Sequence, residues 1–103
     1  MTDMPQAQAC ADLLQALAEP SRIRLIDCLR TGPKHVTQLA GLIGAEIVNV
    51  SHHLGVLRTA RMVETVRQGR LVVYALAPGY FSLDASSDTL VSLGWCTVHI
   101  PLA

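Results

Sequence analysis

The chain has 103 residues, which is enough for one domain over 1–103 and too few for two separate hydrophobic cores. Half of the residues are hydrophobic and 16% are charged, which excludes a disordered chain. The eight basic and eight acidic side chains balance, no apolar run could cross a bilayer, and no signal pattern begins the chain, so we expect a cytoplasmic protein without membrane attachment.

Two helices separated by a proline are predicted first. Apolar residues at spacing i, i+3, i+4 and i+7 predict a helix that follows a loose end at residues 1–6. Pro20 ends this helix and suits the first turn of the next one, which ends at Gly32-Pro33. The second helix is apolar over most of its circumference between residues 23 and 29, so we expect it to be central. The stripe of the first helix consists of Cys10, Leu13, Leu14 and Leu17.

A helix-turn-helix is predicted over residues 36–61. The third helix repeats the apolar stripe up to Ile43, with Thr37 as a cap near its start and Gly44 closing it. A fourth helix follows and ends near Arg61, and two short helices around a tight turn that contains glycine form this motif. The inner face of the fourth helix consists of Ile47, Val50, Leu54 and Leu57.

A β-hairpin, in the position of a wing, is predicted over residues 62–76. Two segments rich in β-branched side chains flank Gln68-Gly69, which suits a two-residue turn. The tip of the hairpin is therefore expected to carry two basic side chains. With that turn, the facing pairs are Val63 with Tyr74, Thr65 with Val72, and Arg67 with Arg70.

The last segment, residues 80–103, has a weaker pattern. Ser86 or Ser87 suits the cap of a short helix through Leu93, and alternation over Trp95–Ile100 favours a strand. The predicted fold is therefore mainly α with a small β-hairpin, a winged helix-turn-helix that ends in a short helix or a strand.

The outer face of the fourth helix indicates contact with double-stranded DNA. It presents amide, imidazole and hydroxyl groups, and no carboxylate occurs between residues 47 and 63. Residues 47–76 carry four arginines and one glutamate, and a basic turn after a helix-turn-helix suits a wing on the phosphate backbone. The predicted DNA-binding residues are Asn49, Ser51, His52, His53, Arg67, Gln68 and Arg70.

Residues 50–57, V-S-H-H-L-G-V-L, resemble the recognition helix of bacterial ArsR/SmtB-type winged-helix repressors, whose signature is roughly V-S-x-H-L-x-x-L. The resemblance includes L-A-E-P-S-R-I-R-L at residues 17–25 and Gln68-Gly69-Arg70, and it covers roughly residues 10–77. It implies a homodimeric repressor of roughly palindromic operators that an effector releases. Ile47 and Val48 depart from the family, which often carries polar residues there that reach DNA.

The effector site is not defined by the sequence. The three cysteines form no C-x-x-C pair, and residues 35–42 match the family's metal box on the third helix without its cysteine. The candidate residues for a metal or thiol-reactive sensor are Cys96, Cys10 and Cys28, of which the latter two also suit the core. The cofactor stays unknown. Because thiolates bind soft metal and metalloid ions, such an ion is the option that the cysteines suggest. His35, near a turn, is expected to be solvated.

Two other classes of function fit the sequence less well: an enzyme and a protein-interaction module. The acidic residues are scattered and no catalytic motif occurs, so we do not expect an enzyme. The alternative is a winged-helix protein-interaction module without effector sensing, in which apolar Ile47 and Val48 contact a partner. For the DNA-binding protein we expect a twofold homodimer through residues 80–103, with Leu13, Leu17 and residues 90–100 in its interface.

Overall fold

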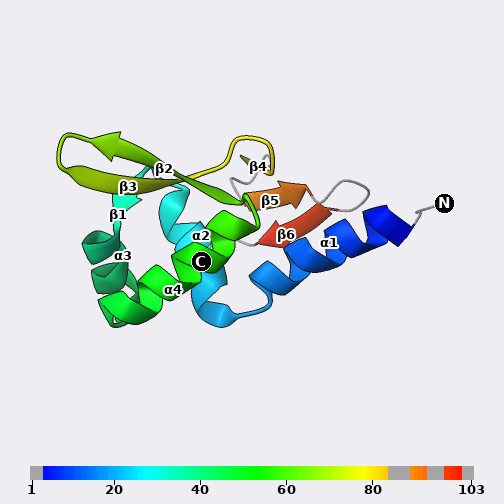
Figure 1. Cartoon of the computed structure of the whole chain (residues 1–103), viewed down its shortest axis with the longest axis horizontal. Helices are drawn as coiled ribbons and strands as arrows, with labels where there is room; N and C mark the ends of the chain where they lie inside the picture. Colours follow the sequence, from blue (N-terminus) through cyan, green and yellow to red (C-terminus); the bar gives the residue numbers. More distant parts are fainter. Residues whose placement is uncertain (1–3, 84–88, 93–96, 101–103) are drawn as a thin grey trace.

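The computed structural model describes residues 4–83, 89–92 and 97–100, in which four helices are followed by small antiparallel sheets (Figure 1). This arrangement is a winged helix-turn-helix and confirms the predicted fold class. None of the helices in the described part of the chain has the length and apolarity needed to cross a membrane. The elements are α1 Met4–Leu17, α2 Pro20–Leu29, β1 Lys34–His35, α3 Val36–Ile43, α4 Ile47–Thr59, β2 Val63–Gln68, β3 Leu71–Leu76, β4 Phe81–Leu83, β5 Thr89–Ser92 and β6 Thr97–Ile100.

The junction of α1 and α2 follows directly from its sequence. Pro20 occupies the start of α2, where its missing N–H would have no helical partner, and the carboxylate of Glu19 accepts a hydrogen bond from the backbone N–H of Arg22 at 3.1 Å. As predicted, α2 is central, since it contacts α1, α3, α4 and β3. The expected loose end at residues 1–6 is wrong for its second half, because α1 already begins at Met4.

The cap of α3 differs from the prediction. His35, not Thr37, is the cap: its Nδ1 accepts from the backbone N–H of Gln38 at 3.3 Å, and the Gln38 side-chain oxygen accepts from the His35 N–H at 3.1 Å. His35 is therefore half-buried and engaged, where we expected a solvated side chain. Gly44 ends the helix in the left-handed conformation with φ +67°, as its position predicted.

The inner face of α4 matches the prediction except at its first residue. Val50, Leu54 and Leu57 are completely buried, whereas Ile47 is 48% exposed because the first turn extends beyond the core. Helix α4 ends at Thr59, and Arg61 adopts φ +62°, which turns the chain into β2.

The wing turn lies one residue later than predicted. Gly69 and Arg70 form the turn, and Gly69 has φ +63° as the first of its two residues, the position that a type II′ turn reserves for glycine. Arg67 therefore faces Val72, and the predicted pairing of Arg67 with Arg70 is wrong, as are the other predicted pairs. The observed pairs include Val63 with Leu76 and Thr65 with Tyr74, and β1 adds a third strand by pairing with β3.

The C-terminal segment forms a second sheet in the order β4-β5-β6. The predicted short helix through Leu93 is wrong over 89–92, where β5 pairs with both neighbours and buries Val91 completely. The predicted strand is confirmed over Thr97–Ile100. The candidate caps Ser86 and Ser87, and Trp95 and Cys96, lie outside the described residues.

The core lies between the helices, the first strand of the wing and β5. Cys10 is buried there, in keeping with its place on the apolar stripe of α1. Leu17 is only 5% exposed and belongs to the same core, so little of its side chain is available for the predicted dimer interface. The apolar side chains that α1 leaves more exposed are Met4, at 81%, and Leu14, at 43%.

Two glycines of the α3 region should respond to alanine in opposite directions. Gly44→Ala should lower the free energy of unfolding by about 1–2 kcal/mol, because an L-residue is strained in the left-handed conformation. Gly41→Ala lies within α3, where the new Cβ would meet no heavy atom within 4 Å apart from its chain neighbours and the local helix backbone, and it should raise the free energy of unfolding by about 0.5–1 kcal/mol. Urea unfolding followed by circular dichroism measures both, and changes of the same sign would contradict this view of the turn.

Candidate nucleic-acid interface

The tip of the predicted wing and the first turns of α4 lie at one end of the molecule. Figure 1 shows the tip of the β2–β3 hairpin and the N-terminal part of α4 at the same end of the longest axis, which measures 46 Å. The N-terminal end of α1 lies at the opposite end. The first turns of α4 and the tip of the wing therefore share one end of the molecule, as a surface that follows a duplex requires.

The outer face of α4 carries accessible polar side chains. Asn49, Ser51 and His52 are exposed, and His52 lies beside His53 with ring centroids 5.5 Å apart. No carboxylate lies on α4 itself, so the polar groups of this face can approach base edges without like-charge repulsion from the helix.

His53 occupies a different place from the other predicted DNA contacts. Its side chain is 18% exposed and lies toward α2, with Nδ1 3.2 Å from Nη1 of Arg22 and Nε2 3.7 Å from the Glu19 carboxylate. A guanidinium only donates, so Nδ1 accepts and the imidazole proton lies on Nε2, facing Glu19. This geometry gives His53 a positioning role between the helices, which pattern analysis missed because Arg22 is 31 residues away in sequence.

Arg22 connects three helices through its guanidinium. Nε donates to the carbonyl of Ala16 at 2.6 Å and Nη2 to that of Gln15 at 3.4 Å, both in the last turn of α1, while Nη1 contacts His53 on α4. Arg24, two residues later, donates from Nη1 to the carbonyl of Ile43 at 3.0 Å. Two arginines of α2 thus satisfy terminal carbonyls of the helices on either side, where the helix dipole also favours a cation.

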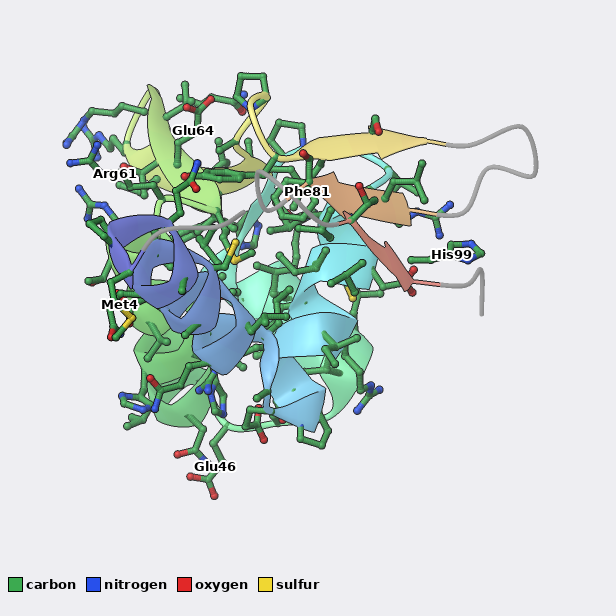
Figure 2. All side chains as sticks on the ribbon, turned by 90° about the vertical axis from the view of Figure 1, so that its right-hand side faces the viewer. Met4, Glu46, Arg61, Glu64, Phe81 and His99 are labelled. Carbon is green, nitrogen blue, oxygen red and sulfur yellow. The ribbon has the colours of Figure 1, made fainter. Side chains whose placement is uncertain are left out.

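The wing supplies the positive charge of the candidate interface. Arg67, Gln68 and Arg70 are all exposed at its tip, and neither arginine forms a salt bridge within the described residues. Arg61 and Glu64, at the base of the wing, lie on one side of the molecule (Figure 2). The tip is therefore a doubly basic surface, although its two arginines do not face each other across the strands.

The candidate sensor cysteines differ in their surroundings. Cys10 is buried in the core, and Cys28 is half-buried at the end of α2. Burial raises the pKa of the Cys28 thiol, and Asp27 raises it further, while Lys34 and Arg24 oppose the change only in part. A raised pKa leaves less thiolate, the form that binds metals and reacts. Cys96 lies outside the described residues, among which no cluster of three or more His, Cys, Asp or Glu side chains is suited to a metal.

Comparison with known proteins identifies similar chains. The family model for the bacterial regulatory proteins of the arsR family matches residues 19–65. The HTH-type transcriptional regulator NmtR of Mycobacterium tuberculosis is 49% identical over 74 residues, which cover 72% of this chain and 62% of that protein. The chain spans about three fifths of the length of the first curated relatives that it matches.

Solved structures show the same likeness. The transcriptional repressor BigR from Xylella fastidiosa is 35% identical with a TM-score of 0.66, over 72% of this chain and 73% of that one. The homodimeric winged helix-turn-helix DNA-binding domain of Mb0332 from Mycobacterium bovis is 27% identical with a TM-score of 0.68, over 77% of this chain and 75% of that one.

Removal of the guanidinium that joins the helices should destabilise the fold. We expect Arg22→Ala to lower the free energy of unfolding by about 2 kcal/mol, because it leaves terminal carbonyls of α1 without their donor. Arg70→Ala is the matched control, since this exposed arginine of the wing should change stability by less than about 0.5 kcal/mol. Both are measured by urea unfolding. Equal stabilities of the two variants would show that the hydrogen bonds of Arg22 do not stabilise the fold.

Proposed function

The chain belongs to the ArsR family of bacterial DNA-binding regulators, and we propose that it acts as a homodimeric repressor that an effector releases from its operator. The observations that carry the proposal are the acid-free outer face of α4 and the doubly basic wing tip, with the first turns of α4 and the tip at the same end of the molecule. The family consists of regulators and not of enzymes, in agreement with the expectation from the sequence.

In the proposed complex, α4 enters the major groove and the wing follows the adjacent phosphates. Asn49 and His52 contact base edges, Ser51 contacts the backbone, and Arg67 and Arg70 neutralise phosphates. Gln68 lies next to the turn and is available as a further donor to the backbone. His53, in contact with Arg22 and Glu19, holds α4 in place.

We propose a twofold dimer in which α1 and the C-terminal sheet contribute the interface. The exposed Met4 and Leu14 of α1 supply apolar surface for this contact, in place of the buried Leu17. The domain of Mb0332, which is described as homodimeric, supports the proposal by analogy. Such a dimer presents two recognition helices about one DNA turn apart, which suits a palindromic operator.

A protein-interaction module is the second candidate. The exposure of Ile47 and Val48, 48% and 77%, favours it, because apolar side chains at the start of α4 suit a protein partner as well as a duplex. Dependence on salt separates the two candidates, since phosphate contacts release counterions and a protein interface need not.

Binding to the DNA just upstream of the gene tests the primary proposal. Arg70→Ala should weaken binding to this DNA and to random duplex alike, and lower the slope of log K against log salt by about one. His52→Ala should weaken binding to the upstream DNA alone, by about 1–3 kcal/mol. Fluorescence anisotropy at several salt concentrations measures both; a parent protein without salt-dependent binding would favour the protein-interaction module instead.

For the effector we propose sensing through sulfur, with Cys96 as the required thiol. Two observations support this choice: burial of Cys10 restricts access to its thiol, and the raised pKa of Cys28 leaves less of the reactive thiolate. The effector class is a metal or metalloid ion or a thiol oxidant.

The assay for sulfur sensing is release of bound DNA by arsenite, zinc, copper(I) and peroxide, added in turn. Cys96→Ser should abolish the release seen with the parent protein, whereas Cys10→Ser and Cys28→Ser should respond as the parent does. If the Cys96→Ser variant releases its DNA at the same effector concentration as the parent protein, the sensor lies elsewhere.

A further inference from the structure

The first turn of α4 exposes an apolar side chain on the face that the proposed function assigns to DNA. Val48 is 77% exposed, the largest exposure of any apolar residue of the helix-turn-helix. It precedes His52 by four residues, so the two side chains are neighbours on one helix face. Val48 therefore shares the outer face with a residue placed at base edges.

The position of Val48 along the helix is that of a base-contacting residue. In a helix-turn-helix, the N-terminal residues of the second helix meet base edges, and Val48 is the second residue of α4. A valine offers no hydrogen bond, so it can contribute to recognition only through an apolar group of the DNA. In the major groove that group is the C5-methyl of thymine.

The charges around this turn favour the base edges over the phosphates. Glu46, directly before α4, is exposed and makes no side-chain cap bond, and Figure 2 shows it extending away from the molecule. A carboxylate there is repelled by a nearby phosphate, while the arginines of the wing tip attract the backbone on their own side. The first turn of α4 is thus suited to the groove and the wing to the strand beside it.

We propose that Val48 is a specificity-determining residue that packs against the C5-methyl group of a thymine in the operator. The proposal rests on the proposed function, since it requires that α4 enters the major groove. A duplex is favoured over an apolar protein surface because exposed polar Asn49 and His52 lie near Val48 on α4 and the basic wing tip lies at the same end of the molecule.

The test uses uracil, which lacks only the methyl group of thymine. Each thymine of the bound upstream duplex is replaced in turn, and dissociation constants are measured by fluorescence anisotropy for the parent protein and for Val48→Ala. At one thymine per half-site, uracil should weaken parent binding by about threefold to fivefold, as loss of one buried methyl contact implies. Val48→Ala should bind thymine and uracil duplexes equally at that position.

Val66→Ala is the matched control, because Val66 is an exposed valine, 44%, that lies on the wing. This variant should keep the uracil sensitivity of the parent. Equal parent affinity for all uracil duplexes, or uracil sensitivity that survives in Val48→Ala, overturns the proposal and leaves Val48 to a protein contact. Absence of DNA binding by the parent overturns the proposed function as well, so the two failures are distinguishable.

Discussion

The arrangement of the helices depends on one constraint. Two arginines of α2 donate hydrogen bonds to the C-terminal ends of α1 and α3. Arg22 reaches carbonyls in the last turn of α1, and Arg24 reaches the last carbonyl of α3. Apolar packing alone would allow the helices to slide along one another, since contact between hydrophobic surfaces is non-directional. Hydrogen bonds at defined carbonyls fix where α1 and α3 end relative to α2.

The recognition helix inherits its orientation from this arrangement. Val50, Leu54 and Leu57 bury the inner face, and the contact of His53 with Arg22 sets the flank. Because these contacts fix the rotation of α4 about its axis, they also fix the orientation of its polar outer face. The histidine that a sequence pattern assigns to DNA is thus part of the scaffold that presents its neighbours.

The sequence predicted the elements that depend on local chemistry and missed those that depend on distant partners. Helix ends at Pro20 and Gly44 follow from backbone preferences, and both were predicted. The role of His53 and the pairing of β1 with β3 depend on residues far apart in sequence, and no local signal shows them. At the wing, two turns that differ by one residue are compatible with the same alternation, and the φ preference of Gly69 decides between them.

The short strand β1 has a mechanical consequence. Its two residues pair with the middle of the wing, and His35, the second of them, caps α3 in the very next position of the chain. A tilt of the wing therefore pulls on the start of the helix-turn-helix, so the two contact elements should behave as one stiff body and not as two independent arms. In the proposed dimer, an effector is then expected to weaken DNA binding by changing the distance between the two copies of this rigid unit, and not by changing the shape of either copy.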